Sequence, residues 1–314
     1  MKIVFFGSSE FSIPVLEAIL SSKYAVSQVI TTPDRKKGRG QKIASSIVKT
    51  FSEERRLPVL TPEKLSMLEV VEKIKRAAPD FLIIASYGKM VPKSIFSIPK
   101  IASLNVHPSL LPKYRGASPI QSAILNGDTE TGVSIAEVTS ELDSGDIFAQ
   151  MKTKIGENEN AFELSDRLSK MAGKLLLEVI HQFEAGKISR TSQDSSKSVY
   201  AGKINKEAGK IDWRESAIKI HNQIRAYYPW PGALTLFHGK RLKILKAQVV
   251  ESSAKQEKTP GTILKIDSGG GIQIQTQTGI LELLRLQPEG RREMSASEFA
   301  RGERIKEGDR FESQ

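Results

Sequence analysis

Short apolar runs alternate with amphipathic stretches over about the first 155 residues. The apolar runs are rich in Ile, Val and Phe and are bounded by Gly, Pro or Ser, which is typical of strands, whereas the stretches between them show helical spacing. The predicted strands are Lys2–Phe6, Val26–Thr32, Pro58–Leu60, Phe81–Ala85, Ser103–His107, Val133–Val138 and Ile147–Ile155, and the predicted helices are Ile13–Ser22, Ser45–Glu54, Met67–Ala77 and Pro119–Leu125. This alternation predicts an α/β fold with a Rossmann-like, mostly parallel, doubly wound sheet.

A long helix and a second, smaller domain follow the predicted sheet. Residues 163–183 carry apolar side chains near one stripe and predict a helix that packs on the sheet. After a helix over Ile218–Tyr227, five short alternating runs separated by Gly and Pro turns favour a small OB-like β-barrel. The five runs are Thr235–Phe237, Arg241–Val250, Thr262–Ile266, Gly271–Thr276 and Ile280–Leu286. We therefore predict an α/β domain over 1–188, an exposed basic linker over 189–209 and a β-barrel domain over 210–314.

The composition is that of an ordinary globular protein and excludes several kinds of chemistry. Of the 314 residues, 39% are hydrophobic and 26% are charged. The absence of cysteine excludes disulfides, thiolate metal sites and a cysteine nucleophile, and four histidines favour a mechanism without metal. No apolar run reaches the roughly 20 residues of a membrane span, and the first residues lack a signal-peptide layout. We therefore expect a cytoplasmic protein that does not enter membranes, and a monomer.

The formal net charge of +11 is the first indication of a partner. Residues 201–250 alone contain ten Lys and Arg against three Asp and Glu. This density is typical of proteins that bind a polyanion such as nucleic acid. A solvated basic face on an ordinary domain is the competing interpretation.

The first turn between strand and helix, at residues 6–14, is where dinucleotide-binding folds place a glycine-rich phosphate loop. Here the turn contains Gly7 alone, and Glu10 would add negative charge beside a pyrophosphate. A dehydrogenase that uses nicotinamide is therefore disfavoured. Gly7 is better explained by a tight turn that lets the first helix pack.

A stronger indication of chemistry lies at the end of the strand predicted over 103–107. Period-2 alternation places Asn105 and His107 on one face of this strand, at the sheet edge where open α/β folds bind ligands. Asp143 follows the strand over 133–138 and lies at the same edge if the two strands are parallel. An amide, an imidazole and a carboxylate together suit acyl transfer to an amine, because that reaction needs oxyanion stabilisation and proton handling. Taken singly, His107 is more often a core histidine and Asp143 a turn residue.

The motifs that carry this chemistry resemble those of the folate-dependent formyltransferases. They are SLNVHPSLLPKYRGASPIQSAILNGDTETGVSI (103–135), LDSGDI (142–147), FFGSSEFSIPVL near the start, TTPDRKKGRGQK (31–42), YYPWPGA (227–233) and LQPEGRREMSASEF (286–299). They occur in order from Met1 to about Arg304 and extend into both predicted domains. The resemblance implies transfer of the formyl group of 10-formyltetrahydrofolate, a donor substrate, to the amino group of methionine on initiator tRNA.

The resemblance also implies roles for individual residues. Asn105, His107 and Asp143 would be catalytic, and Ser109, Leu110, Leu111 and Pro112 would contact the folate. The residues Tyr87, Gly88 and Met90 end the strand over 81–85 at the same edge and are candidates for the wall of the pterin pocket. An ordinary loop is the competing interpretation of that segment.

Two basic segments are candidates for tRNA binding. The loop at 34–42 contains Arg35, Lys36, Lys37, Arg39 and Lys42 with two glycines, and we expect it to be mobile until bound. It departs from the commoner proline-containing form of the motif by reading Lys36-Lys37 before Gly38. The linker adds Lys203 and Lys206. A solvated run of charge is the alternative for both segments.

Three other functions compete with this interpretation, and the sequence disfavours two of them. A formyltransferase acting on a sugar nucleotide shares the Asn–His–Asp set and a small C-terminal barrel. A free-standing glycinamide ribonucleotide formyltransferase normally ends near residue 200 and has a glycine-rich phosphate loop, which this chain lacks. A catalytically inert RNA-binding module is disfavoured by the intact Asn105, His107 and Asp143, and a formylation assay separates these cases.

Overall fold

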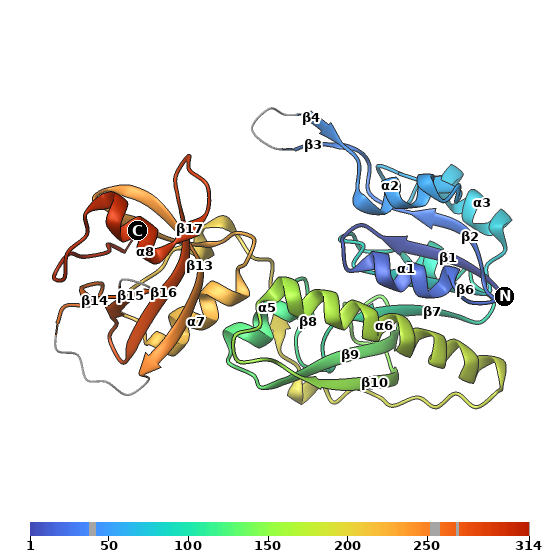
Figure 1. Ribbon diagram of the computed structural model, residues 1–314. Coiled ribbons are helices and arrows are strands. Elements are labelled where there is room, and N and C mark those ends of the chain that lie inside the picture. The colour runs from blue at the N-terminus through green and yellow to red at the C-terminus, as the bar shows by residue number, and fades with distance from the viewer. Residues whose placement is uncertain (38–41, 252–257, 268–269, 314) are drawn as a thin grey trace. The chain divides into compact units, whose positions relative to one another are not determined.

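The computed structural model describes residues 1–37, 42–251, 258–267 and 270–313 (Figure 1). The chain forms two compact units. Unit 1 comprises Met1–Pro119, Glu130–Lys154 and Ser165–Gly202, and unit 2 comprises Ile120–Thr129, Ile155–Leu164 and Lys203–Gln314. Each unit therefore combines segments that are far apart in the sequence.

A seven-stranded sheet forms the centre of unit 1, in the order β10-β9-β7-β6-β1-β2-β5. Its strands are β1 (Lys2–Gly7), β2 (Ala25–Ile30), β5 (Val59–Leu60), β6 (Phe81–Ala85), β7 (Ala102–His107), β9 (Glu130–Glu137) and β10 (Ile147–Lys154). The pairs from β7 to β5 are all parallel, whereas β9 and β10 are added antiparallel. The predicted Rossmann-like, mostly parallel sheet is confirmed.

Helices cover both faces of this sheet. Their bounds are α1 (Ser12–Leu20), α2 (Ile47–Glu54), α3 (Leu68–Ala77), α4 (Lys93–Phe96) and α6 (Ala161–Glu184), whereas α5 (Pro119–Leu125) falls in unit 2 except for its first residue. Alternate residues of β1, Val4 and Phe6, join a buried cluster with Ile74 of α3 and Ile95 of α4. In α6, the ring of Phe183 meets Phe81 of β6 edge-on at 5.4 Å. The near-continuous apolar strands follow from this burial on both sides.

One strand direction differs from the prediction in a way that affects the candidate site. The strand predicted over 133–138 is β9, and it runs antiparallel to β7, with Ser134 opposite His107 and Glu137 opposite Leu104. The condition under which Asp143 would lie at this edge, a strand parallel to β7, is therefore not met. Asp143 reaches Asn105 because the loop at 138–146 folds back before β10 begins at Ile147.

The basic loop is flanked by two short strands that the sequence pattern did not predict. β3 (Arg35–Lys37) pairs antiparallel with β4 (Lys42–Ala44), and Figure 1 shows the pair extending away from β2 and α2. The flanks of the loop thus form a ladder, because backbone pairing satisfies their polar groups without an apolar anchor. Arg39 lies outside the described residues.

The segment after α6 is bonded to unit 1 along part of its length. β11 (Tyr200–Ala201) pairs in parallel with β8 (Arg115–Gly116), and Thr191 forms an antiparallel bridge with Ile147 of β10. A short 3₁₀ helix, Ser195–Lys197, lies between these two attachments. Much of the segment remains exposed.

Unit 2 is built on an antiparallel sheet in the order β12-β13-β16-β15-β14, with β17 paired to β16. Its elements are the 3₁₀ helix Lys206–Gly209, α7 (Ala217–Ala226), β12 (Ala233–Phe237), β13 (Lys240–Glu251), β14 (Ile263–Ile266), β15 (Ile272–Gln275), β16 (Ile280–Pro288), β17 (Met294–Ser295) and α8 (Ala296–Glu303). The C-terminal residues close this sheet, because Glu312 bridges to Leu236 of β12 and Arg310 bridges to Thr262 just before β14. All five predicted strands form, and the closure gives the predicted small barrel.

Candidate active site

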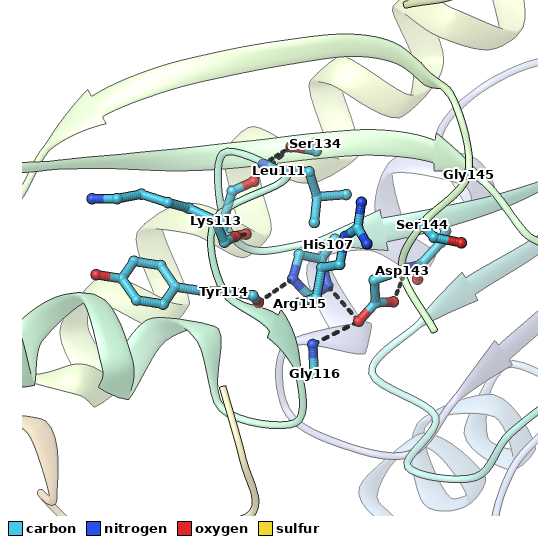
Figure 2. A network of polar contacts seen from close by, with 12 residues as sticks. His107, Leu111, Lys113, Tyr114, Arg115, Gly116, Ser134, Asp143, Ser144 and Gly145 are labelled. Atoms are coloured by element: carbon cyan, nitrogen blue, oxygen red, sulfur yellow. Dashed lines mark hydrogen bonds and ion pairs between the residues drawn. The ribbon is translucent and has the colours of Figure 1, made fainter. Parts of the chain in front are cut away.

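Two side chains of the central strand β7 open the candidate site. Asn105 is half-buried and His107 is buried, and both lie toward the carboxyl end of β7, where the strand passes into the loop at 108–114. Figure 2 shows His107, Tyr114, Gly116 and Asp143 converging at this point. Asn105, His107 and Asp143 are called the trio below, and the structure brings all three together.

The two ring nitrogens of His107 face different groups. Nε2 lies 2.9 Å from the carbonyl oxygen of Tyr114. Because a carbonyl only accepts hydrogen bonds, Nε2 carries a proton and donates it there. Nδ1 lies 3.8 Å from Oδ2 of Asp143, beyond hydrogen-bond distance. Nδ1 is therefore the nitrogen that can gain or release a proton beside the carboxylate.

Each carboxylate oxygen of Asp143 accepts one hydrogen bond. The side-chain amide of Asn105 donates to Oδ1 at 2.8 Å, and the backbone N–H of Gly116 donates to Oδ2 at 2.8 Å. Such donors fix the orientation of a carboxylate. Asp143 has φ +52°, a left-handed conformation that is uncommon outside glycine. The backbone conformation of Asp143 directs its carboxylate toward Asn105 and Gly116.

The candidate folate loop at 109–112 is fixed by two residues that the sequence reasoning missed. Ser134 of β9 donates to the carbonyl of Ser109 at 2.6 Å and accepts from the backbone N–H of Leu111 at 3.0 Å (Figure 2). Gln150 of β10 donates to the carbonyl of Leu111 at 2.9 Å. A serine with no exposure on an otherwise apolar strand was the available signal for Ser134. Leu110 and Pro112 complete the loop, and Leu111 is buried.

The three candidates for the pterin pocket after β6, Tyr87, Gly88 and Met90, differ in their exposure and backbone conformation. Tyr87 is 1% exposed, and its ring meets that of Phe6 edge-on at 5.2 Å. Its hydroxyl is buried and has no hydrogen-bond partner among the described residues. Burial raises the pKa of Tyr87 to about 12, so the hydroxyl stays protonated. Gly88 has φ +77°, and Met90 is 70% exposed.

A further residue missed by the sequence reasoning, Gln193, contacts the loop that carries Asp143. The amide nitrogen of Gln193 donates to the carbonyl oxygens of Asp143 at 2.9 Å and Gly145 at 2.7 Å. Its amide oxygen accepts from Nε and Nη2 of Arg115 at 3.1 and 2.9 Å. Gln193 lies in a polar run with no periodicity, so no sequence pattern marked it.

The candidate tRNA-binding residues are spread over both units. Arg35 begins β3 in unit 1 and is exposed, and the backbones of Lys36, Lys37 and Lys42 form the hairpin with it. In unit 2, Lys203 and Lys206 are exposed at its beginning. Arg39 is outside the described residues.

Two kinds of feature are absent from the part of the chain that the structure describes. No group of three or more His, Asp and Glu side chains converges there. None of the helices described is both long enough and apolar enough to cross a membrane.

Comparison with known proteins assigns the class. Residues 1–180 match the family described as Formyl transferase, and residues 203–304 match the family described as Formyl transferase, C-terminal domain. The chain therefore belongs to the formyltransferase family. Relatives over the full length are methionyl-tRNA formyltransferases. One from Dictyoglomus turgidum is 45% identical over 314 residues, covering 100% of both chains, and one from Sulfurihydrogenibium sp. is 41% identical over 313 residues, covering 99% of this chain and 100% of the relative.

Solved structures support the fold. A methionyl-tRNA formyltransferase from Clostridium thermocellum matches with a TM-score of 0.54 at 19% identity, over 82% of this chain and 95% of that one. An N-formyltransferase from Helicobacter canadensis in complex with folinic acid and dTDP-3-aminofucose matches with a TM-score of 0.63 at 21% identity, over 92% and 99%. Because both identities are low, these matches establish the architecture alone, and the full-length relatives identify the branch of the family.

Proposed function

We propose that the trio catalyses transfer of the formyl group of 10-formyltetrahydrofolate to the α-amino group of methionyl initiator tRNA. The observation that carries this proposal is the carboxylate of Asp143, held by Asn105 and Gly116 and facing Nδ1 of His107. This set combines an amide donor, an imidazole and an oriented carboxylate, which are the groups that acyl transfer to an amine requires. The full-length relatives are named for this reaction.

The reaction is an exchange of one carbon–nitrogen bond for another. The neutral α-amine forms a bond to the formyl carbon, and the carbonyl π pair moves onto oxygen to give a tetrahedral oxyanion. Collapse breaks the bond between this carbon and N10 of the folate. The amine loses one proton and N10 gains one, so the products are formylmethionyl-tRNA and tetrahydrofolate. A free α-amine has a pKa of about 8, so oxyanion stabilisation is the larger barrier.

Asn105 and His107 are the donors toward the oxyanion. One N–H of the Asn105 amide is held by Asp143, and the second N–H is the one assigned to the substrate. For His107, Nε2 is committed to the Tyr114 carbonyl, which leaves Nδ1–H of the protonated ring as the donor. Removal of one such donor costs about 10²–10³ in rate in other enzymes.

Asp143 serves as the acceptor of the amine's proton, directly or through water. Its two oxygens are oriented by Asn105 and Gly116, so the remaining lone pairs have fixed directions. When His107 is protonated, the same carboxylate stabilises the imidazolium at 3.8 Å. The carboxylate thus links proton removal from the amine to the charge on the ring.

The residues around the trio fit a bound folate. The loop at 109–112 is fixed by Ser134 and Gln150; Ser109 and Leu111 are buried, so the partly exposed Leu110 and Pro112 are the side chains that would contact a ligand in this proposal. Tyr87 is assigned to this pocket by the family resemblance; its ring is buried in the cluster with Phe6, so it would support the pocket wall from behind rather than bond the ligand through its hydroxyl. The exposed thioether of Met90 and the adjoining Gly88 form the neighbouring wall in this proposal.

The tRNA is bound in this proposal by the basic hairpin and by the start of unit 2. The basic loop at 34–42 is assigned Arg35, Lys36, Lys37, Arg39 and Lys42 in this proposal, and the segment after β11 is assigned Lys203 and Lys206. Exposed Lys and Arg side chains contact phosphates as long as no internal partner competes for them. The division into a catalytic domain (1–188), a basic linker (189–209) and a tRNA-binding domain (210–314) belongs to the same proposal, as do a monomeric state and a cytoplasmic location.

One assay tests the function. The protein is incubated with 10-formyltetrahydrofolate and, separately, with methionyl initiator tRNA, uncharged tRNA and an amino-sugar nucleotide. We expect formylated product with methionyl-tRNA alone. Product with the amino-sugar nucleotide would favour the substrate of the Helicobacter canadensis enzyme instead, and no product with any acceptor would leave an RNA-binding module.

A further inference from the structure

Gln193 uses both ends of its side chain to join two parts of the candidate site. Its amide nitrogen donates to the carbonyl oxygens of Asp143 and Gly145, at 2.9 and 2.7 Å. Its amide oxygen accepts two hydrogen bonds from the guanidinium of Arg115. The side chain therefore ties the backbone of the Asp143 loop to the strand β8.

Arg115 is buried next to the residue that bonds the Asp143 carboxylate, so its placement affects the position of that carboxylate. It is 7% exposed, and a cation buried to this degree must be hydrogen-bonded to be tolerated. The next residue, Gly116, donates its backbone N–H to Oδ2 of Asp143. The amide of Gln193 thus positions Asp143 in two ways. It bonds the backbone carbonyl of Asp143 directly, and it holds Arg115, whose neighbour Gly116 bonds the Asp143 carboxylate.

The chain beyond Gln193 secures the same strand from its other side. Val199 accepts from the backbone N–H of Arg115 at 2.9 Å, and Ala201 accepts from the N–H of Ala117 at 2.8 Å. Residues 193–201 therefore form a strap across the backbone that holds Asp143. This strap lies between residues 1–180 and 203–304, the two parts of the chain that match the family.

Asp143 needs this external support because its own backbone does not favour the conformation. A left-handed φ on a residue with a Cβ costs of order 1 kcal/mol or more and persists where the surroundings determine it. Four hydrogen bonds converge on the carboxylate and the two carbonyls of this loop, and two of them come from Gln193. Without the two bonds from Gln193, the backbone carbonyls of Asp143 and Gly145 would no longer be held in place.

We propose that Gln193 is a positioning residue that sets the Asp143 carboxylate for proton transfer. The proposal rests on the proposed function, since it assigns Gln193 a part in that reaction. Gln193 touches no reacting atom in this assignment and acts through Asp143. A misplacement of about 1 Å of a catalytic group can cost about 10²-fold in rate, so the expected effect is on turnover rather than on binding.

The first test replaces Gln193 by Met, which keeps the length of the side chain and removes all four hydrogen bonds. For Gln193→Met we expect kcat for methionyl-tRNA to fall about tenfold or more, with KM for both substrates within about threefold. Gln28→Met is the matched control, because Gln28 donates its amide to the carbonyl of Pro58 at 2.8 Å on strand β2 of the same unit. The control should lose thermal stability without losing kcat. Equal kcat for the two variants would overturn the proposal.

A double-mutant cycle with Asp143→Asn separates positioning from a general structural role. If Gln193 acts through Asp143, Gln193→Met should change kcat by less than about twofold in the Asp143→Asn background. The same loss in both backgrounds would contradict the proposal. Should Gln193→Met fail to fold, Gln193→Glu retains the acceptor for Arg115 and loses both donors, and the same loss of kcat is expected. An inactive wild-type protein in this assay would refute the proposed function instead.

Discussion

At the scale of single residues, Asn105 and His107 supply the donors of the proposed reaction. His107→Ala and Asn105→Ala should each lower kcat by about 10² or more, because each removes one donor toward the oxyanion. Steady-state formylation of methionyl-tRNA measures this. Folding should survive, since each side chain lies at the end of β7, and circular dichroism checks it. A variant with nearly normal turnover would remove that residue from the mechanism.

Asp143 can be tested without changing its shape. In Asp143→Asn, the new NH₂ group meets a donor, either the amide of Asn105 or the N–H of Gly116, so one hydrogen bond is replaced by a repulsive contact. Loss of the proton acceptor should lower kcat by about 10² or more. The measurement is the rate between pH 6 and 9. Unchanged rates over that range would contradict the role of the carboxylate.

His221 of α7 predicts a pH dependence of folding that is separate from catalysis. Burial and then the nearby Arg225 charge lower the pKa of His221 from 6.5 to about 4, while Glu157 and a hydrogen bond with the Ala247 backbone oppose the shift. Below pH 6.5 the unfolded chain takes up a proton that the folded chain does not. The free energy of unfolding therefore keeps its full value above pH 6.5 and falls by about 3 kcal/mol as the pH is lowered from 6.5 to 4.

Urea unfolding at pH 7 and pH 4.5 measures this effect in the full chain. Both tryptophans, Trp213 and Trp230, belong to unit 2, so tryptophan fluorescence reports the unit that contains His221. His221→Gln cannot titrate and should show a smaller loss of stability between the two pH values. The same loss in both proteins would assign the acid sensitivity to other groups.

At the scale of elements, the pairing of β8 with β11 depends on one glycine. Gly116 has φ +119°, and a Cβ on it would lie 2.5 Å from the carbonyl oxygen of Ala201. Gly116→Ala should displace β11, disturb the N–H that binds Asp143, and lower both kcat and the free energy of unfolding, the latter by about 1–3 kcal/mol. Kinetics and urea unfolding measure the two effects.

Gly186→Ala is the control for this prediction. Gly186 also has a positive φ, +65°, but among the described residues no atom beyond its chain neighbours lies within 4 Å of the added Cβ. This variant should lose some stability through backbone strain alone, with kcat unchanged. If Gly116→Ala behaves in the same way, the pairing of β8 and β11 contributes nothing to the site.

The longer elements could be predicted from the sequence because they repeat a pattern over many residues. The apolar strands β1, β6 and β7 and the stripe of α6 extend far enough to define a period. β8 and β11 have two residues each, too few for any period, and their partners are distant in sequence. Helix α8 was missed although Ser295 and Glu298 form a capping box at its start, a signature that was readable.

The candidate site was predictable where chemistry and pattern coincide. Asn105 and His107 are polar positions at the end of a long apolar strand, and the structure places them where alternation predicts. The route of Asp143 was not predictable, because the direction of β9 is set by tertiary pairing. Gln193 is one polar residue in a polar run, and only its contacts with Arg115, Asp143 and Gly145 in the fold distinguish it.

At the scale of the whole molecule, the net charge of +11 predicts a strong dependence of tRNA binding on salt. The logarithm of affinity should fall linearly with the logarithm of salt concentration, with about 0.7–0.9 in slope for each phosphate neutralised. Filter binding at several salt concentrations measures the slope. Replacement of both Lys203 and Lys206 by Gln should reduce it by about 1.5. A wild-type slope near zero would mean that the basic surface is only solvated.

The strap at 193–201 also bears on how such a protein can be divided. Most of its contacts are with unit 1, yet it follows α6 and directly precedes the C-terminal domain in the chain. A chimaera joined at residue 180 would contain the trio and lack Gln193 and β11. If the strap positions Asp143, recombination that exchanges the C-terminal domain preserves the chemistry only when the crossover falls after about residue 202. The unit of inheritance for catalysis is then longer than the region that contains the catalytic side chains.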